Sequence, residues 1–600
     1  MNEIKHEIKE INKNNNNTEY NISVSIPMSL GYVNDISFCV YKDNFIKTVD
    51  LKHTNNLNGI SYFNGNTSLD KSNLYHYFIK YKINNITHYL KDDSFKISSL
   101  YNTPSWSQGG VIYHIFVDRF NKGRKEELTP MKNRVIHRDV NEEMVIGPDS
   151  NGIWNNDFYG GDLRGIIEKL DYIKSLGTTI IYLSPIMLSQ SNHRYDTSDY
   201  EMIDPYVGNN EDLKELCDKA HSKGMHVILD AVFNHTGNDS KYFNEYGNFD
   251  TIGAFQSDKS IYFPFYRKHY INGEYKFDYW WGMKNLPVCD GNSKEWQNYI
   301  YGENGVIDKW MSMGIDGLRL DVADELSDEF IKGIHDRVIK NKSDGFILGE
   351  VWKNPMRMNR NYMEYMHSVM NYPLIDALIR YYKYNDKDKL IRIINEIRHE
   401  YPRDTINSLM NFTSTHDISR IIDILSTNEF GINNEWVWDP NNRNHDYQKN
   451  YKISNSEYEK GKKIYKSYLL SLGFLPGNLS IFYGDELGVE GLGNLKNRAP
   501  IKWDQIDEEI LDYIIKMNTV RNKEELLKNS DINLIDVNNN YLMYERVNDI
   551  NNYLVAVNKT DSKCNLVLPS EYYDSMELFK LNNSDKKQLD SFGGLVLKKK

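Results

Sequence analysis

Eight short apolar runs alternate with amphipathic segments between Gly110 and about Asp504, and they constrain the fold of this 600-residue chain more than any other feature. Each run has the length and aliphatic content of a buried parallel strand. The segments between them carry apolar residues at helical spacing, as in residues 163–176 before Gly177. Eight such units close into a (β/α)8 barrel more readily than they spread into an open sheet, so we predict an α/β fold with a TIM barrel. The runs are GVIYHIFVDRF, TTIIYLSPI, HVILDAVFNH, IDGLRLDV, GFILGEVW, VMNYPL, INSLMNF and LSIFYGDEL.

The segments that flank the barrel have different patterns. Residues 1–19 are polar and Asn-rich, which predicts a disordered N-terminal tail. Residues 20–103 contain short alternating runs between turns, which predict an N-terminal β-sandwich. We assign residues 104–510 to the barrel, with an inserted lobe at about 236–292 after the third strand, because so long a connection is usually functional or a subdomain. Residues 511–600 predict a helix and a C-terminal β-sandwich.

Charge and cysteine content exclude several classes of function. Lys plus Arg number 72 against 84 for Asp plus Glu, and the net charge of −12 argues against nucleic acid or an anionic membrane as a partner. The four cysteines lack C-x-x-C spacing, so neither a disulfide framework nor structural zinc is expected. We find no signal peptide and no apolar stretch of about 18 residues, which predicts a cytoplasmic protein.

Acidic residues stand where predicted strands end. Asp230, Asp321 and Glu350 follow three successive apolar runs, and Asp417 follows the seventh. In a (β/α)8 barrel this end of the strands carries the active site. An ion pair or a helix cap is the commoner explanation for any single acid of this kind. Four such acids, each at the end of a predicted strand, favour an active site.

The neighbours of these acids form an ordered set of motifs, namely DAVFNH, GLRLD, GEVW and STHD. In this order the chain resembles the α-amylase superfamily, glycoside hydrolase family 13, from about Ile112 to Asp504. Further strings support the resemblance, among them FYGGDLRGI, SNHRYDTSDY and FYGDELG. Within the family, SNHRYDTSDY, RLDVADE and MNYPL are similar to the branch of neopullulanases, cyclomaltodextrinases and amylopullulanases.

The residue types suit the cleavage of an acetal. That reaction needs a proton for the leaving oxygen and a negative group beside an oxocarbenium-like centre, which two carboxylates supply. We expect Asp321 to be the nucleophile and Glu350, beside Trp352, to be the general acid and then the general base. Arg319 projects from the same strand face as Asp321 and is expected to give it a low pKa. The resemblance implies that Asp417, the third catalytic residue, stabilises the distorted sugar.

The remaining candidates are predicted to bind substrate. His235 and His416 offer donors for sugar hydroxyls, and the resemblance implies that His193 contacts another hydroxyl while Tyr195 provides a stacking platform. Trp352 is expected to line the site beside the acid. For Asp230 and Asn234 a bracing role is favoured over direct chemistry. For Trp281, stacking on further glucose units and packing within the inserted lobe are weighed equally.

The segment that corresponds to a calcium site in relatives lacks one of the expected acids. Relatives often bind calcium through an NGD segment followed by GGD, whereas this chain has GGD at residues 160–162 but Arg124 where an acid is expected. Asn121 and Asp157 are the remaining candidates to bind calcium there. No metal or cofactor is predicted to be required.

The sequence therefore predicts a retaining α-glucan hydrolase that cleaves α-1,4 bonds of maltodextrins, cyclodextrins, pullulan or starch, with α-1,6 cleavage left open. The main alternative is a transglycosylase of the 4-α-glucanotransferase type. A metal-dependent barrel hydrolase would need an H-x-H motif, and a non-catalytic relative would lack the carboxylates. Formation of a homodimer is left open.

Overall fold

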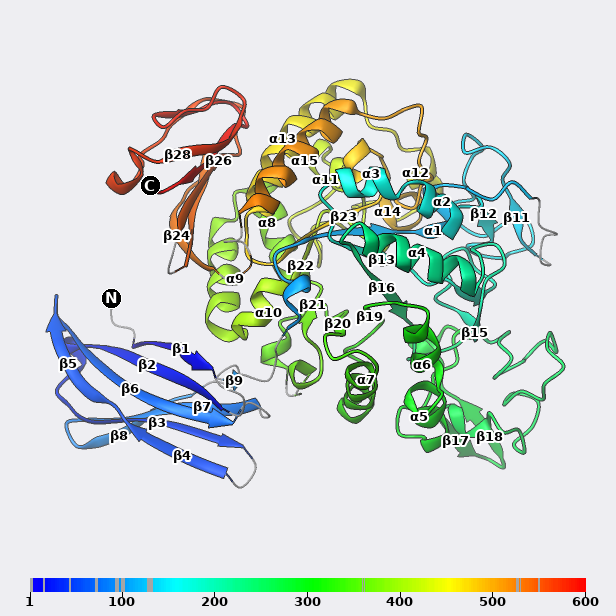
Figure 1. Cartoon of the computed structure of the whole chain (residues 1–600), viewed down its shortest axis with the longest axis horizontal. Helices are drawn as coiled ribbons and strands as arrows, with labels where there is room; N and C mark the ends of the chain where they lie inside the picture. Colours follow the sequence, from blue (N-terminus) through cyan, green and yellow to red (C-terminus); the bar gives the residue numbers. More distant parts are fainter. Residues whose placement is uncertain are drawn as a thin grey trace.

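A closed barrel of eight parallel strands forms the centre of the protein, with helices around it (Figure 1). The computed structural model describes residues 4–13, 17–42, 45–70, 74–91, 96–98, 103–126, 133–358, 360, 362–524, 528, 530–548 and 551–600. The strand order is β21-β20-β19-β16-β13-β10-β23-β22. A parallel bridge between Met370 and Met410 joins the two edge strands and closes the barrel, which confirms the predicted (β/α)8 fold.

All eight predicted strands are present in the predicted order. Every residue of β10, β13, β19, β20 and β23 is buried, as expected for strands that are covered on both faces. The barrel strands are β10 (Val111–Ile115), β13 (Ile180–Leu183), β16 (His226–Ala231), β19 (Gly317–Leu320), β20 (Phe346–Gly349), β21 (Ser368–Val369), β22 (Met410–Phe412) and β23 (Asn478–Phe482).

The helices pack around this barrel and cover its outer surface (Figure 1). The helical pattern of residues 163–176 forms two helices that meet at Lys169. Over the described residues, no helix combines the length and apolar content needed to cross a bilayer. The helices are α1 (Val117–Phe120), α2 (Leu163–Glu168), α3 (Leu170–Ser175), α4 (Asn210–Ser222), α5 (Lys294–Tyr301), α6 (Val306–Ser312), α7 (Asp328–Asn341), α8 (Tyr372–Tyr384), α9 (Lys387–Glu400), α10 (Arg403–Ser408), α11 (Ile421–Ser426), α12 (His445–Asn450), α13 (Asn455–Gly473), α14 (Gly493–Lys496) and α15 (Glu508–Lys523).

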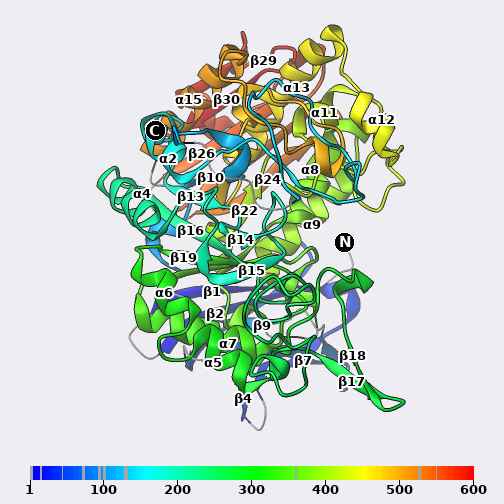
Figure 2. The same ribbon diagram turned by 90° about the vertical axis from the view of Figure 1, so that its right-hand side faces the viewer.

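The long connection after β16 carries little regular structure. Its hairpin, β17 (Lys268–Ile271) with β18 (Glu274–Phe277), protrudes from the molecule in Figure 2. Two other two-stranded sheets lie in the loops of the barrel, and a short 3-10 helix (Asp485–Leu487) follows β23. These pairs are β11 (Val135–Ile136) with β12 (Asp157–Phe158), which is parallel, and β14 (Met187–Ser189) with β15 (Thr197–Ile203), which is antiparallel.

Two antiparallel sheets form the N-terminal domain, in the orders β1-β2-β6-β5 and β4-β3-β7-β8, with β9 paired to β7. Their inner faces share a core that includes Ile22, Val24, Phe38 and Ile79. The strands are β1 (Lys5–Lys13), β2 (Asn17–Pro27), β3 (Val33–Lys42), β4 (Phe45–Asp50), β5 (Lys52–Leu57), β6 (Ile60–Asp70), β7 (Leu74–Ile83), β8 (Ile86–Leu90) and β9 (Lys96–Ser98).

The prediction of a disordered tail over residues 1–19 is wrong for residues 5–13 and 17–19, which lie in strands β1 and β2, whereas residues 1–3 and 14–16 lie outside the described residues. Strand β1 pairs antiparallel with β2 from Lys5–Ser25 to Lys13–Thr18. Ile4 and Ile8 pack against the core of the domain. A polar edge strand of this kind is stabilised by its hydrogen-bonded neighbour, so its own composition carries only a weak signal.

The C-terminal segment follows α15 and contains a five-stranded antiparallel sheet of order β24-β25-β26-β30-β28. Buried Arg521 of α15 ties this region to the barrel, because its guanidinium donates to the carbonyls of Gly109, Gly110, Gly473 and Gly477 at 2.6–2.8 Å. The strands are β24 (Asp531–Val537), β25 (Tyr541–Val547), β26 (Asn552–Asn558), β27 (Cys564–Asn565), β28 (Met576–Leu581), β29 (Gln588–Leu589) and β30 (Gly594–Lys598), of which β27 and β29 form a separate pair.

Candidate active site

The predicted acids meet at the carboxyl ends of neighbouring barrel strands. Asp230 lies near the end of β16, Asp321 follows β19, and Glu350 follows β20. The three strands are adjacent in the sheet, and Asp230 is paired with Arg319 across β16 and β19. Side chains that alternate along a strand place Arg319 and Asp321 on one face, toward the barrel axis.

Arg319 is the centre of this group. Its Nη1 lies 2.9 Å from Asp230 Oδ1 and 2.7 Å from Asp321 Oδ1. Its Nη2 lies 2.7 Å from Glu350 Oε2. The guanidinium is fully buried. One cation therefore holds three carboxylates, two of which are the predicted nucleophile and the predicted general acid.

The electrostatics differ from the prediction for Asp321. Burial raises the pKa of Asp321 well above its usual range, and the charges of Glu350 and Asp230 raise it further, although Arg319 opposes them. Burial also raises the pKa of Asp230. The expectation of a low pKa for Asp321 is wrong, because one guanidinium cannot offset burial together with two further carboxylates.

The backbone after Asp321 is bent toward Glu350. Val322 has a φ of 46°, a conformation that costs a β-branched residue on the order of 1–3 kcal/mol. Its N–H donates to Glu350 Oε2 at 2.9 Å, and Trp352 Nε1 donates to Glu350 Oε1 at 3.0 Å. Trp352 is itself stacked on Tyr372, with ring centroids 4.0 Å apart. Both oxygens of Glu350 are thus held in fixed positions.

A second group forms around Asp417. His416 Nε2 lies 3.1 Å from Asp417 Oδ2, and Arg498 Nη2 lies 3.9 Å from Asp417 Oδ1. Tyr195 stacks on His416 with ring centroids 4.8 Å apart, and its hydroxyl donates to Asp230 Oδ2 at 2.7 Å. The Asp417 side chain is 31% exposed, against 8% for Asp321. Tyr195 connects the two groups into one site with Asp417 at its open side.

The three predicted histidines are neutral at ordinary pH. Burial lowers the pKa of His235 to about 4 and lowers the pKa of His193 and of His416 well below the usual range. His193 Nδ1 accepts a hydrogen bond from Tyr195 N at 3.0 Å. Its Nε2 therefore carries the hydrogen and can donate to a hydroxyl group.

Trp281 lies apart from the acids, on the inserted lobe. Its side chain is 80% exposed and its φ is 50°, so packing within the lobe does not account for it. Trp280 stacks on His235, with centroids 5.0 Å apart. The indole N–H groups of Trp280 and Trp281 both donate to Glu325 Oε1, at 3.2 and 3.0 Å.

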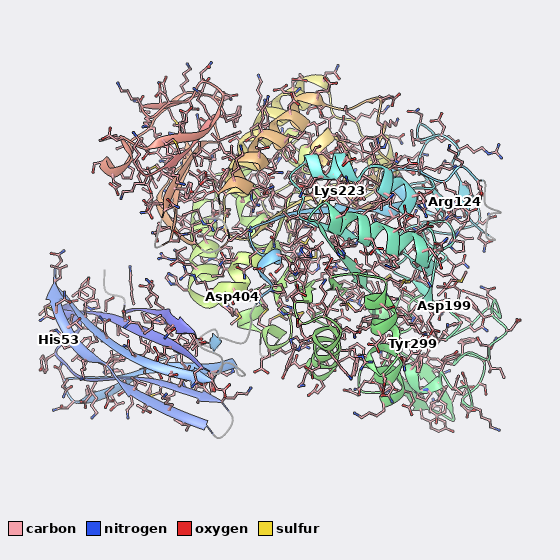
Figure 3. All side chains as sticks on the ribbon, in the orientation of Figure 1. His53, Arg124, Asp199, Lys223, Tyr299 and Asp404 are labelled. Atoms are coloured by element: carbon pink, nitrogen blue, oxygen red, sulfur yellow. The ribbon has the colours of Figure 1, made fainter. Side chains whose placement is uncertain are left out.

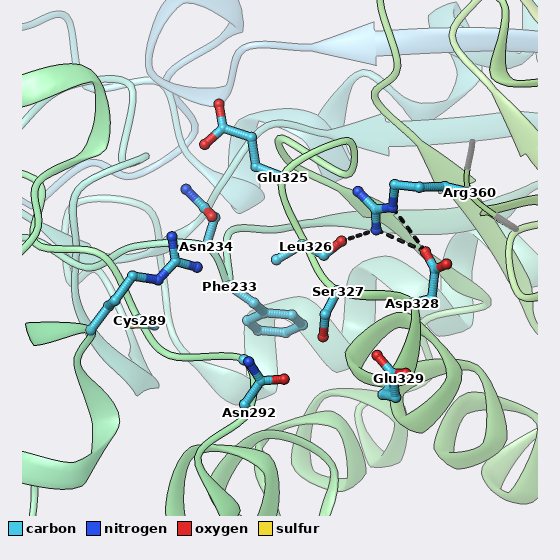
Figure 4. Close-up of a pocket in the computed structure, with 12 residues that line it drawn as sticks. Phe233, Asn234, Cys289, Asn292, Glu325, Leu326, Ser327, Asp328, Glu329 and Arg360 are labelled. Atoms are coloured by element: carbon cyan, nitrogen blue, oxygen red, sulfur yellow. Dashed lines mark hydrogen bonds and ion pairs between the residues drawn. The ribbon is translucent and has the colours of Figure 1, made fainter. Parts of the chain in front are cut away.

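Asn234 lines a cavity of about 280 Å³ between the inserted lobe and the loop after Asp321 (Figure 4). In Figure 4 Arg360 spans one side of it, bonded to Asp328 at 2.8 Å and to the carbonyl of Leu326. None of the four predicted acids lines this cavity.

Three residues of the site escaped the sequence analysis. Arg498 and Glu325 lie on loops, where no periodicity marks a position. Trp436 lies beside Trp352, with ring centroids 5.6 Å apart. The aromatic string WVW after the seventh strand is the sequence signal that could have indicated this residue.

The residues at the calcium position do not fit that ion. Asp162 Oδ1 accepts from Gly165 N at 2.7 Å and Oδ2 accepts from Arg124 N at 2.9 Å. The Arg124 guanidinium binds the carbonyl of Pro205, and Figure 3 places Arg124 at the outer edge of the protein. Asp157 is paired with Arg119 at 3.2 Å. Calcium needs six to eight oxygen ligands, whereas the Asp157 carboxylate here is already neutralised by Arg119.

Comparison with known proteins agrees with this geometry. The family model for the alpha amylase catalytic domain matches residues 114–537. The amylopullulanase of Thermoanaerobacterium saccharolyticum is 32% identical over 83% of this chain and 42% of its own length. The cyclomaltodextrinase of Geobacillus thermopakistaniensis is 28% identical over 78% of this chain and 72% of its own length. This chain thus spans less than half of the amylopullulanase.

The fold extends over the whole chain in a solved structure. The type III pullulan hydrolase from Thermococcus kodakarensis superposes with a TM-score of 0.68, covering 98% of this chain and 97% of its own, at 23% identity. At this identity the likeness supports the arrangement of barrel and flanking β domains and nothing finer.

Proposed function

The chain belongs to the α-amylase family of glycoside hydrolases, and we propose that it is a retaining α-glucan hydrolase that cleaves α-1,4 glucosidic bonds. The proposed substrates are maltodextrins, cyclodextrins, pullulan and starch, and the names of its relatives support this range. The observation that carries the proposal is the guanidinium of Arg319, which holds Asp321 and Glu350 at the ends of adjacent strands.

The reaction proceeds in two displacements. Asp321 attacks the anomeric carbon while Glu350 gives its proton to the leaving glycosidic oxygen, and a glycosyl ester forms. Glu350 then takes a proton from water, the water oxygen attacks the anomeric carbon, and the ester bond to Asp321 breaks. The product keeps the α configuration. Two acids bound to one guanidinium suit the spacing of roughly 5–5.5 Å that this mechanism requires, rather than the roughly 6.5–9.5 Å of inverting enzymes.

The second group of residues orients the sugar. Asp417, at the open side, accepts from sugar hydroxyls, and His193, His235 and His416 contact others as neutral imidazoles. Tyr195 offers its ring to one face of the sugar. Arg498 faces Asp417 at 3.9 Å and keeps the pKa of that carboxyl from rising further above its usual range.

Substitution of the two catalytic acids tests the proposal. We expect Asp321→Asn and Glu350→Gln to lower kcat/KM on maltohexaose by about 10⁴-fold or more, with unchanged circular dichroism. Asp344→Asn, at an exposed acid before the other end of β20, is the control and should keep full activity. The assays follow dialysis against EDTA, which should not reduce activity if no metal is required.

The stereochemistry and the products decide between mechanisms. Proton NMR should record the α anomer first in the wild-type reaction, and an initial β anomer would refute the covalent mechanism. Products longer than maltohexaose would instead identify a 4-α-glucanotransferase. Digestion of pullulan to panose, rather than to maltotriose, would assign the cleavage to α-1,4 bonds.

Location and assembly belong to the same proposal. We place the enzyme inside the cell, in line with the name of a relative, the intracellular maltogenic amylase of Bacillus subtilis, which is 28% identical over 77% of this chain. A homodimer stays a prediction that sedimentation can measure.

A further inference from the structure

A cluster of metal-binding side chains lies at the end of the barrel opposite to Asp321. His226 begins β16, Asp316 precedes β19, and His221 lies in the last turn of α4. His221 Nε2 is 2.7 Å from Asp316 Oδ2, and His226 Nδ1 is 3.3 Å from Asp316 Oδ1. One potential ligand atom from each residue falls within 4.8 Å of the others. We propose that these three residues form a binding site for a divalent transition-metal ion such as Zn²⁺ or Co²⁺.

The ligand set and its spacing fit such an ion. Two imidazoles and one carboxylate are the donors that Zn²⁺ and Co²⁺ prefer over Mg²⁺ or Ca²⁺. Bonds of about 2.0–2.2 Å to a tetrahedral ion place neighbouring ligand atoms roughly 3.3–3.6 Å apart. His226 and Asp316 already have this spacing. His221 Nε2 contacts the other oxygen, Oδ2, at 2.7 Å, and the three ligand atoms lie within 4.8 Å of one another, so a rotation of the His221 side chain at the end of its helix would complete the set.

The cluster is both supported and accessible. Asp316 is fully buried and accepts a hydrogen bond from Val227 N at 2.7 Å. The ring of His226 stacks on Trp106, with centroids 4.1 Å apart and an angle of 13°. The side chains of His221 and His226 are 35% and 28% exposed to solvent. Solvent can therefore reach the open coordination position while two of the three ligands are held in place.

The contact of Lys342 with Asp316 shows that the Asp316 carboxylate attracts a cation. Its ammonium contacts Asp316 Oδ1, and its side chain is 30% exposed. A metal ion would compete with this ammonium for the same oxygen, and the flexible lysine would turn to solvent. Removing the ammonium should therefore strengthen metal binding, which separates a metal site from a purely structural ion pair.

The site would stabilise the barrel without altering catalysis. The ion would join the end of α4 to the starts of β16 and β19. The other ends of these two strands carry Asp230 and Asp321. His226 and Asp230 are four residues apart on β16, or about 13 Å along a strand. An ion bound only by the folded protein raises the temperature of unfolding, whereas the catalytic acids lie beyond its coordination sphere.

Titration of the EDTA-treated protein with Co²⁺ tests the proposal. The wild type should bind one equivalent with the visible d–d absorption of a low-symmetry Co²⁺ site. His221→Ala and His226→Phe, which preserves the stack on Trp106, should weaken binding by roughly 100-fold. Lys342→Met should tighten it by about tenfold. His269→Ala removes a histidine outside the cluster that is paired with Asp278 at 3.2 Å, and should change nothing.

Two further measurements complete the test. Zn²⁺ should raise the unfolding temperature of the wild type but not of His221→Ala, with kcat on maltohexaose unchanged within twofold. Absorption that persists in both histidine variants would assign the ion to another site. Absence of binding in both the wild type and Lys342→Met would refute the proposal, and neither result would bear on the proposed hydrolase.

Discussion

Arg319 divides its two Nη atoms among three carboxylates, and this arrangement depends on the planar shape of the guanidinium. Lysine carries the same charge at a single point and cannot reach Asp230, Asp321 and Glu350 together. At the scale of single residues, the site is therefore more sensitive to the geometry of the cation than to its charge.

Arg319→Lys tests this dependence. Arg319 opposes the rise in the pKa of Asp321, so a poorer partner should let that pKa rise further. Because the nucleophile must be ionised, the acid limb of the kcat/KM profile should move to higher pH, and the maximum should fall by about 10²–10³-fold. Arg337→Lys is the matched control, because Arg337 on α7 forms an ion pair with Asp308 on α6. An acid limb that does not move would contradict the argument.

Residues at strand ends could be predicted from the pattern of the strands, whereas His193 and Tyr195, on a loop, were predicted only through the resemblance to the family. Asp230, Arg319, Asp321 and Glu350 lie at strand ends that periodicity alone locates. The pKa of Asp321 could not be predicted, because it depends on how many acids share one guanidinium. Arg498 and Glu325 reach the site by the folding of loops, which leaves no pattern in the sequence.

At the scale of elements, the inserted lobe is attached to the loop that carries the nucleophile. Glu325, four residues after Asp321, accepts from both indoles of Trp280 and Trp281, and Trp280 packs on His235. The predicted lobe was placed correctly after the third strand because of its length and aromatic content. One of its contacts is made by an exposed carboxylate that composition does not reveal.

Glu325→Ala should free both tryptophans from this attachment. If Trp281 stacks on glucose units beyond the cleavage point, KM for maltoheptaose should rise by about 3–10-fold, equivalent to losing roughly 0.7–1.4 kcal/mol. The KM for maltotriose and the kcat should change little. Glu325→Gln keeps an acceptor oxygen and should restore most of the affinity. Glu329→Ala, at a residue that lines the same 280 Å³ cavity as Glu325, serves as the control. An equal rise in KM for both substrates would exclude the stacking role.

At the scale of the whole molecule, the order of barrel and β domains followed from the sequence, whereas the first strand did not. Residues 4–9 alternate between half-buried and exposed positions, which is the period of a strand. The Asn-rich composition concealed this short pattern. Pairing with β2 supplies the hydrogen bonds that the segment needs, so its structure depends on a neighbour rather than on its own apolar content.

The stability of the whole molecule should depend on a buried acid, Glu486, that is outside the group of acids around Arg319. Glu486 follows β23 and accepts from the hydroxyls of Tyr113 on β10 and Tyr172 on α3, at 2.5 and 2.7 Å. Burial raises the pKa of Glu486 from 4.5 to about 7. A raised folded-state pKa contributes stability that is fully present below pH 4.5 and is lost as the pH rises through about 7. The loss is on the order of 3 kcal/mol.

Glu486→Gln removes this titration while keeping an acceptor for the two tyrosines. The unfolding temperature of the wild type should therefore fall relative to that of the variant between pH 5 and pH 8, as measured by differential scanning calorimetry. Asp239 and Asp423, whose pKa values burial also raises to about 7, titrate in both proteins and cancel in the difference. Glu508→Gln, at an acid in the first turn of α15, is the control. A constant difference in unfolding temperature across this range would show that Glu486 does not change its charge there.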